Sequence, residues 1–172
     1  MNAPQVIVVA GLPGSGKSTV ADGIARELGI PVLSVDPIES AIIESGFARS
    51  FETGLAAYLV AQSSAAAQLR LGLSVVIDAV SPVEQARAMW RQLAAEYGAG
   101  LRLIECVLDP ELHRARVEAR VRGLPGIPEV TWDDVEQRRR TCLPWSEERL
   151  ILDTARPAAD VIREAVAAAR GA

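Results

Sequence analysis

Short apolar runs alternate with longer helix-like segments along the whole chain. The runs are nearly continuous in apolar, often β-branched residues, which is typical of strands buried on both faces of a sheet. They cover residues 5–10, 32–35, 74–77, 101–108 and 150–152. Helical patterns lie between them, near 17–28, 37–45, 54–71, 83–97, 110–122, 131–140 and 157–170. This alternation predicts an α/β fold, with a parallel sheet, right-handed crossovers and helices on both faces.

Capping sequences predict where several of these helices begin. Ser81-Pro82-Val83-Glu84 has serine at the N-cap, proline at the first helical position and glutamate three residues after the serine. Asp109-Pro110 repeats the pairing of cap and proline, and Thr131 precedes a turn rich in acidic residues. The segment Asp36-Pro37-Ile38-Glu39 has the same form, so Asp36 is placed to cap the helix that follows it.

Length and charge narrow the class of protein. The chain has 172 residues, which predicts a single domain over residues 1–172 with a sizeable core. Its net charge of −4 disfavours a nucleic-acid backbone or an anionic membrane as the partner. Its two cysteines give no disulfide scaffold, and no segment has the length of a membrane span. We therefore expect a cytoplasmic monomer or homodimer.

A phosphate-binding motif is the strongest chemical signal in the chain. Residues 11–18 read Gly-Leu-Pro-Gly-Ser-Gly-Lys-Ser, which matches GxxxxGK[ST] in full, between an apolar run and a helical pattern. The glycines allow backbone N–H groups to wrap around a phosphate, and the helix N-terminus adds free donors and a favourable dipole. The alternative is a glycine-rich turn that matches the motif by chance.

The residue types in the motif predict ATP and Mg²⁺ as its ligands. Lys17 is expected to reach the β- and γ-phosphates, and the Ser18 hydroxyl to ligate Mg²⁺. Of the 18 lysine and arginine residues, 17 are arginines, and the one lysine is Lys17. It lies inside the phosphate-binding motif, where the compact ammonium of lysine differs most in its binding properties from the planar guanidinium of arginine. The predicted nucleotide-binding residues of this segment are Gly11, Leu12, Pro13, Gly14, Ser15, Gly16, Lys17, Ser18 and Thr19.

The sequence resembles the small P-loop kinases, which include chloramphenicol phosphotransferase, the kinase half of polynucleotide kinase, gluconate kinase and zeta-type toxins. The resemblance lies in GLPGSGKST after a strand, in two later aspartates and in an arginine-rich segment. No lysine is left to form the Asn-Lys-x-Asp element of guanine-specific GTPases. The resemblance implies a three-layer α/β/α fold with a five-stranded parallel sheet in the order 2-3-1-4-5 and a helical lid.

Asp36 follows the second predicted strand, in Val-Leu-Ser-Val-Asp-Pro. In the phosphotransferases that the sequence resembles, a carboxylate at this position is the general base that accepts the proton of the acceptor hydroxyl. The residues themselves leave three roles open for Asp36, as a base, as a metal ligand or only as a helix cap.

Asp78 ends the run Val-Val-Ile-Asp on the third predicted strand, which is the pattern of a Walker B element. Such a carboxylate lies beside the phosphate loop and holds Mg²⁺ directly or through water. Because the pattern is common, a residue that only caps the turn after the strand is the alternative. The predicted metal-binding residues are Ser18 and Asp78.

Arginines are concentrated between residues 113 and 140, where seven arginines and five acids give a local balance of +2. Helical patterns flank the break Gly123-Leu-Pro-Gly-Ile-Pro128, which is the form of a mobile lid over about 113–140. Resemblance to the kinases implies that lid arginines close over the triphosphate, and Arg116 and Arg120 fit the family's Arg-x-x-x-Arg pattern on one helix face. Arg138 is a further candidate. The alternative is a solvated, salt-bridged helix pair.

The remaining reactive side chains receive no role from their pattern. His113 is the one histidine, and its place in the first turn of a helix predicts a surface residue. Cys106 is expected in a buried strand and Cys142 in a loop, and neither belongs to a metal-binding set.

Residues 36–71 are expected to line the acceptor pocket. Phe47, Phe51 and Tyr58 lie in this stretch, which holds only two arginines, so a weakly charged or apolar hydroxyl compound fits it better than a second phosphate. An antibiotic-like alcohol, a nucleoside or a sugar would qualify. Ordinary core packing of these aromatic residues is the alternative.

The C-terminal segment Leu-Ile-Leu-Asp-Thr-Ala-Arg-Pro resembles the last strand and adenine-side loop of the same kinases. The resemblance implies that Asp153, Thr154 and Arg156 approach the base of the nucleotide.

The predicted function is ATP- and Mg²⁺-dependent transfer of the γ-phosphoryl group to a hydroxyl of a small molecule. The residues expected to act in catalysis are Lys17, Asp36, Arg116 and Arg120. Two alternatives stay open. One is a polynucleotide 5′-hydroxyl kinase, which the pI of 5.1 disfavours. The other is a slow ATPase that acts as a nucleotide-dependent switch without an acceptor.

Overall fold

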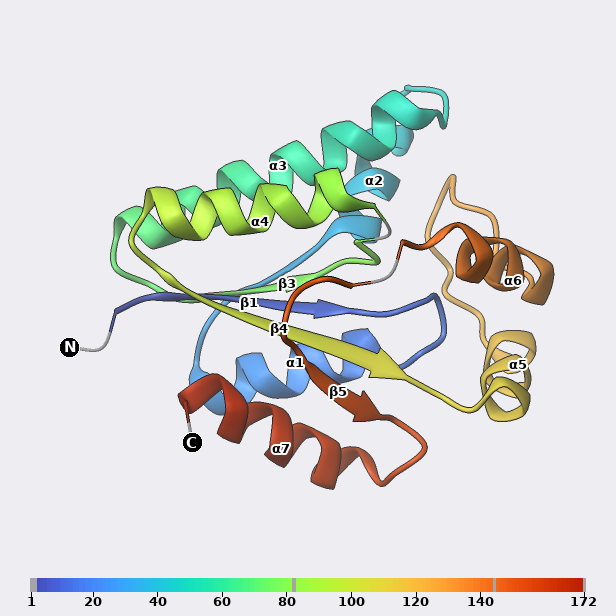
Figure 1. The fold of residues 1–172 in the computed structure, drawn as a ribbon. Helices are drawn as coiled ribbons and strands as arrows, with labels where there is room; N and C mark the ends of the chain where they lie inside the picture. The colour runs from blue at the N-terminus through green and yellow to red at the C-terminus, as the bar shows by residue number, and fades with distance from the viewer. Residues whose placement is uncertain (1–2, 82, 144, 172) are drawn as a thin grey trace.

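The computed structural model describes residues 3–81, 83–143 and 145–171, which form five strands and seven helices. The strands are β1 (Gln5–Ala10), β2 (Val32–Ser34), β3 (Val75–Asp78), β4 (Gly100–Val107) and β5 (Leu150–Asp153). The helices are α1 (Lys17–Leu28), α2 (Val35–Glu44), α3 (Phe51–Arg70), α4 (Glu84–Glu96), α5 (Pro110–Ala119), α6 (Trp132–Thr141) and α7 (Ala158–Arg170). The strands make one parallel sheet in the order β2-β3-β1-β4-β5, so the predicted fold and strand order are confirmed (Figure 1).

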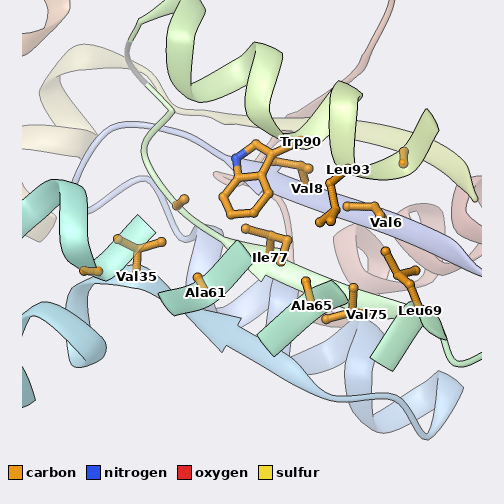
Figure 2. Packing of buried hydrophobic residues seen from close by; sticks show 13 residues of the cluster. Val6, Val8, Val35, Ala61, Ala65, Leu69, Val75, Ile77, Trp90 and Leu93 are labelled. Carbon is orange, nitrogen blue, oxygen red and sulfur yellow. The ribbon is translucent and has the colours of Figure 1, made fainter. Parts of the chain in front are cut away.

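An apolar core lies on each face of the sheet, because the strands are apolar on both sides. On one face α3 and α4 cover the sheet, and Figure 2 shows Trp90 and Leu93 of α4 packed over strand residues such as Val8. On the other face α1 and α7 pack against the strands through residues that include Ile24 and Val161. Among the helices that the structure describes, none is both long enough and apolar enough to cross a membrane.

The strand register brings the expected site residues to one edge of the sheet. Asp78 at the end of β3 pairs with Val9 of β1 on one side and with Ser34 of β2 on the other. Ala10, the last residue of β1, pairs with Glu105 of β4. In a parallel sheet the carboxyl ends of all strands share one edge, and ligands of open α/β sheets bind in the crevice outside it. The phosphate-binding motif begins directly after Ala10, at this edge.

Of the four predicted N-caps, Asp109 and Thr131 are confirmed, and Ser81 and Asp36 are wrong. Asp109 accepts hydrogen bonds from two backbone N–H groups of α5, and Thr131 forms a capping box at the start of α6. Helix α4 begins instead with Val83 as its N-cap. Ser81 stays in the preceding loop with a φ of 50°, where tertiary hydrogen bonds described below hold its backbone. The predicted proline at the first helical position, Pro82, lies outside the described residues.

Asp36 does not cap the helix that follows β2. The N-cap of α2 is Ser34, and Asp36 is the second residue of the first turn. A negative charge there interacts favourably with the helix dipole. Of the three roles that the sequence left open, the structure therefore removes the cap.

Helix α5 is shorter than its pattern predicted. It ends before Arg120, whose backbone is extended, so the prediction that Arg116 and Arg120 share one helix face is wrong. The physical reason lies farther along the chain. The Glu129 carboxylate accepts hydrogen bonds from the backbone N–H of Arg122 at 2.8 Å and of Gly123 at 3.0 Å, and these bonds close the segment into a loop.

Candidate active site

The phosphate loop has a shape that depends on its glycines. Gly14 and Gly16 have φ angles of 84° and 87°, in the left-handed region that other residues rarely adopt. A Cβ atom on Gly14 would lie 2.6 Å from Cγ2 of Val117, so the loop also needs glycine for its packing under α5. Gly16 is the N-cap of α1, and the first N–H groups of that helix have no intrahelical partner. The loop therefore offers free backbone donors to an anion.

Lys17 and Asp78 form a buried ion pair behind the loop. Lys17 Nζ lies 3.5 Å from Asp78 Oδ1, and the two side chains are only 4% and 6% exposed. The Ser34 hydroxyl donates to the other carboxylate oxygen, Oδ2, at 3.0 Å. Oδ1 accepts no hydrogen bond from any residue that the structure describes. Asp78 thus fixes the ammonium of Lys17 through Oδ1, while Ser34 orients the carboxylate through Oδ2.

The Asp78 carboxylate, whose Oδ1 accepts no hydrogen bond from the described residues, fits a hard cation such as Mg²⁺, which prefers oxygen ligands and keeps several waters. Ser18 supplies a hydroxyl next to Lys17 in sequence and lines the cavity described below. Within 3–81, 83–143 and 145–171, no three His, Cys, Asp or Glu side chains come together as a metal cluster. A metal held here would therefore need the phosphate oxygens of a nucleotide and water as its other ligands.

A cavity of about 440 Å³ opens beside the loop. It brings together residues from four parts of the chain, namely the phosphate loop, the end of α5, the turn after β5 and the start of α7. Of the predicted nucleotide-binding and catalytic residues, those that line it are Gly14, Gly16, Lys17, Ser18, Thr19, Arg116, Arg120 and Arg156. Gly11 and Leu12 line a different cavity, while Pro13 and Ser15 are buried.

Arg116 ties the lid segment to the turn after β5. Its Nη2 donates to the Thr154 carbonyl at 2.8 Å, and its Nη1 lies 3.4 Å from the Thr154 hydroxyl. That hydroxyl lies 2.7 Å from the Ser15 carbonyl, to which it donates, and 3.2 Å from the Val107 carbonyl. Thr154 therefore joins the phosphate loop, the end of β4 and Arg116 in one hydrogen-bonded unit at the wall of the cavity.

Arg120 and Arg156 reach the same cavity from different elements. Burial lowers the pKa of Arg120, and the nearby positive charge of Arg122 adds to this effect. Arg156 lies after β5 and forms an exposed ion pair with Glu164 at 2.6 Å. Of the residues that the C-terminal resemblance singled out, Thr154 and Arg156 line the cavity, and Asp153 is not among its lining residues.

Asp36 meets the lid through Arg122, a residue for which the sequence predicted no role. Arg122 Nη2 donates to Asp36 Oδ2 at 2.7 Å. Burial by itself would raise the pKa of Asp36, but the charges of Lys17 and Arg122 and the hydrogen bond from Arg122 outweigh burial. The pKa of Asp36 is therefore below its usual value. Arg138, the further candidate from α6, also lowers this pKa through its charge.

The lid turn rests on helix α2. The Ser40 hydroxyl donates to the Pro125 carbonyl at 2.8 Å. Gly126 packs so closely on Ile43 that a Cβ atom there would lie 2.3 Å from Ile43 Cγ2. Figure 1 shows α5, α6 and the loop between them beyond the carboxyl edge of the sheet. With the Arg122–Asp36 pair, these contacts hold the predicted lid segment along α2, from Asp36 to Ile43.

His113 is buried, so its prediction as a surface residue without a role is wrong. Only 2% of the residue is exposed, and its Nε2 lies 2.7 Å from the Pro13 carbonyl in the phosphate loop. Nδ1 lies 3.5 Å from Arg139 Nη2, and the ring meets Trp132 edge-on with centroids 5.5 Å apart. Nε2–H donates to the carbonyl, which leaves Nδ1 to accept. Burial lowers the pKa of His113, and the charges of Arg139 and Arg116 act in the same direction.

The aromatic residues expected in the acceptor pocket separate into two groups. Phe47 and Phe51 are 64% and 80% exposed, on the outer side of the molecule. Tyr58 instead packs against Trp90 with ring centroids 6.2 Å apart, and its hydroxyl accepts a hydrogen bond from the Ser81 N–H at 3.2 Å. Tyr58 therefore contacts the loop that follows β3 at the carboxyl edge of the sheet. The two cysteines lie as predicted, with Cys106 buried in β4 and Cys142 directly after α6.

Comparison with known protein families finds one matching family model, the AAA domain, over residues 6–142. Among curated proteins, "Uncharacterized protein Rv2004c" of Mycobacterium tuberculosis is 30% identical over 131 residues, which are 69% of this chain and 26% of that protein. The bifunctional polynucleotide phosphatase/kinase of Schizosaccharomyces pombe is 27% identical over 136 residues, which are 78% of this chain and 29% of the length of that protein. The chain thus spans less than a third of the length of these relatives.

Solved structures share the fold over nearly the whole chain. The APS kinase CysC of Mycobacterium tuberculosis, in complex with AMPPNP and APS, superposes with a TM-score of 0.74 at 22% identity, over 99% of both chains. A gluconokinase from Sinorhizobium meliloti gives a TM-score of 0.73 at 23% identity, over 100% of this chain and 95% of that one. This chain therefore has the fold of the P-loop kinases.

Proposed function

Because the chain belongs to the AAA domain family, we propose that it is an ATP- and Mg²⁺-dependent kinase that phosphorylates a hydroxyl group of a small molecule. One observation supports this proposal most. Lys17, Asp78 and Asp36 lie close together at the carboxyl edge of the sheet, where Lys17 pairs with Asp78 and also lowers the pKa of Asp36. A lysine ammonium near one carboxylate for the metal and another for the acceptor proton is the set of groups that phosphoryl transfer uses.

The triphosphate would lie in the cavity of about 440 Å³, with its phosphates along the backbone donors of the loop. Lys17 would contact the β- and γ-phosphates, and Arg116 and Arg120 would face them from the lid side. Arg156 and Thr154 would lie toward the base. Ser18 and Asp78 would hold the metal, which when bound neutralises the developing charge on the phosphates.

Asp36 is the proposed general base. In the transfer step the acceptor oxygen bonds to the γ-phosphorus while the bond from that phosphorus to the β–γ bridging oxygen breaks. ADP leaves, and the proton of the acceptor hydroxyl passes to Asp36. The lowered pKa keeps this carboxylate ionised at neutral pH, so it can accept a hydrogen bond from the acceptor hydroxyl and take its proton as the new P–O bond forms. The docked lid would exclude water that otherwise hydrolyses ATP.

Screening for acceptor-stimulated ATP consumption, with ³¹P detection of the products, tests this proposal. The screen should include small alcohols, sugars, nucleosides and 5′-hydroxyl oligonucleotides, because one curated relative is a polynucleotide phosphatase/kinase. We expect a small-molecule acceptor to raise turnover and Asp36→Asn to lower it at least a hundredfold while ATP binding is retained. Stimulation by oligonucleotides alone would favour a polynucleotide 5′-hydroxyl kinase. Slow ATP hydrolysis that no compound stimulates would favour a nucleotide-dependent switch without an acceptor.

A further inference from the structure

Exposed apolar side chains gather on and beside helix α3. Of the twelve large apolar residues that are exposed within the described ranges, seven lie between residues 47 and 73. Three of them are on α3 itself, where Leu55, Leu59 and Val60 are 46%, 50% and 46% exposed. Single apolar residues scattered over a surface need no explanation, but a contiguous group is typical of a surface that contacts another molecule.

Helix α3 has an inner face and an outer face. The inner face packs toward the sheet and has a buried residue at every fourth position, namely Thr53, Ala57, Ala61, Ala65 and Leu69 (Figure 2). The opposite side, which we call the outer face, consists of Glu52, Leu55, Ala56, Leu59, Val60, Ser63, Ala67 and Arg70. Helices α2 and α4 pack against α3, yet every residue of the outer face stays exposed or half-buried. Figure 1 shows α3 at the upper edge of the molecule.

The outer face is uncharged between two opposite charges. Residues 53–69 contain no Asp, Glu, Lys or Arg, whereas the exposed side of α7 bears charges of both signs, such as the Arg163–Asp160 ion pair. Glu52 lies in the first turn of α3 and Arg70 in the last. Neither forms an ion pair with any residue that the structure describes. Both charges are therefore available to a partner.

Glu52 and Arg70 lie on one line along the helix. Positions 52 and 70 are five turns of about 3.6 residues apart, so the two side chains leave the helix in the same direction, about 27 Å from each other. They are too far apart to attract each other within one chain. A second copy of α3, running antiparallel across the outer face, would bring its Arg70 beside Glu52 and its Glu52 beside Arg70. One twofold axis near Ala61 thus pairs all four charges.

The uncharged side chains of the outer face fit the same arrangement. The large residues Leu55 and Leu59 lie in its N-terminal half, and the small residues Ser63 and Ala67 lie in its C-terminal half. Antiparallel pairing places the leucines of each copy over the small side chains of the other, which allows close packing. Parallel pairing would instead set leucine against leucine and like charges against each other.

We propose that the outer face of α3 binds the same face of a second copy of this chain, antiparallel, in a symmetric homodimer. The contact is about 30 Å long and about 10 Å wide, the dimensions of one helix. This is at the small end of specific interfaces, so we expect a dimer that dissociates on dilution, with a Kd of about 1–100 μM. The dimer forms whether or not the kinase proposal holds, because no residue that lines the nucleotide cavity belongs to the outer face.

Sedimentation velocity at chain concentrations from about 1 to about 500 μM covers the expected range of Kd and measures the dimer. We expect the wild type to sediment increasingly as a dimer as its concentration rises. Leu59→Lys places two like charges beside the twofold axis and should raise the Kd at least about a hundredfold. Leu112→Lys is the matched control, because Leu112 is also an exposed leucine of a helix, 40% exposed on α5, and it should leave the Kd unchanged.

Charge reversal tests the orientation of the two helices. Glu52→Arg and Arg70→Glu should each raise the Kd about tenfold at low salt, because each places like charges side by side at both ends of the dimer. The double variant should return to nearly the wild-type Kd. No effect within one chain explains such a rescue, since the two charges are five turns apart. Circular dichroism checks that every variant keeps its helix content.

Three results would overturn the inference. They are a wild-type chain that stays monomeric at the highest concentration, a dimer that Leu59→Lys leaves intact, and a double charge-reversal variant that dimerises no better than the single ones. The first would assign the outer face to a different partner, the second would place the dimer contact elsewhere on the chain, and the third would exclude the antiparallel arrangement.

Discussion

Arg122 donates a hydrogen bond to Asp36 across 2.7 Å, and this bond joins the lid to the second residue of α2. The two residues are 86 positions apart in the chain. Their contact couples two properties that a kinase has to control together, the closure of the lid and the protonation of the proposed base. A change in the position of the lid segment that breaks the Arg122–Asp36 contact should therefore change the pKa of Asp36.

Replacing Arg122 with Gln should change the pH dependence of turnover. Removal of its charge and its hydrogen bond takes away two of the effects that lower the pKa of Asp36, so that pKa should rise. The acidic limb of kcat/KM against pH should move to higher pH, because the base is then protonated over a wider range. Arg114→Gln removes an exposed arginine paired with Glu118 and should leave the profile in place. An identical profile in Arg122→Gln would show that Asp36 does not govern that limb.

Lys17→Met should abolish nucleotide binding and lower turnover at least a hundredfold, because the buried ammonium is the proposed contact to the β- and γ-phosphates. The same change leaves the buried Asp78 carboxylate without its cation, so unfolding should also become easier. Nucleotide titration by calorimetry and a thermal melt measure the two effects separately. Asp78→Asn keeps the shape of the site, and we expect it to raise the Mg²⁺ concentration needed for half-maximal turnover. Normal ATP binding by Lys17→Met would contradict the assignment of the loop.

His113 should make the protein less stable as the pH falls below about 6.5, the ordinary pKa of histidine. The folded-state pKa of His113 is lowered, so the unfolded chain binds the proton more readily. The stabilising contribution is therefore complete above the unfolded pKa and is lost as the pH falls through the folded one. Urea titrations between pH 5 and 8 should show this loss in the wild type and a smaller pH dependence in His113→Gln. Equal slopes in both proteins would assign the pH dependence to other groups.

Gly126→Ala should displace the lid turn from α2. The new Cβ atom would lie 2.3 Å from Ile43 Cγ2, a distance that neither chain segment can accept without moving. Gly123→Ala is the control, since Gly123 also has a positive φ but no heavy atom within 4 Å of the added carbon. Both variants should carry the backbone cost of about 1–2 kcal/mol, and only Gly126→Ala should raise the acceptor KM and increase ATP hydrolysis without acceptor. Ile43→Ala should restore the Gly126→Ala variant, and failure to do so would argue against the docked lid.

The sequence predicted the features that local patterns determine. All five strands and seven helices of the described residues were expected near their observed places, because apolar runs and helical periodicity depend on neighbours in sequence. The positive φ angles of Gly14 and Gly16 belong to the phosphate-binding motif, whose residues are consecutive in the sequence. These predictions need no knowledge of which distant segments meet.

Other features depend on contacts between distant segments, and the sequence did not contain a signal for them. His113 looked exposed by its place in a helix, but it packs under Pro13, 100 residues away. Arg122 was one of seven arginines in the lid, and nothing local distinguishes it from its neighbours. Ser81 had every property of an N-cap, and the Tyr58 and Arg87 side chains hold it elsewhere. In each case tertiary hydrogen bonds decided the outcome over local preference.

The solitary lysine has a practical consequence for chemical labelling. Because Lys17 is the only lysine of the sequence and is buried beside Asp78, general amine reagents should label its side chain poorly. An acyl-phosphate derivative of ATP instead carries its reactive carbonyl to the amine nearest the phosphates. With such a reagent, the mass of one peptide would report how fully the loop is occupied, in a mixture as complex as a cell lysate.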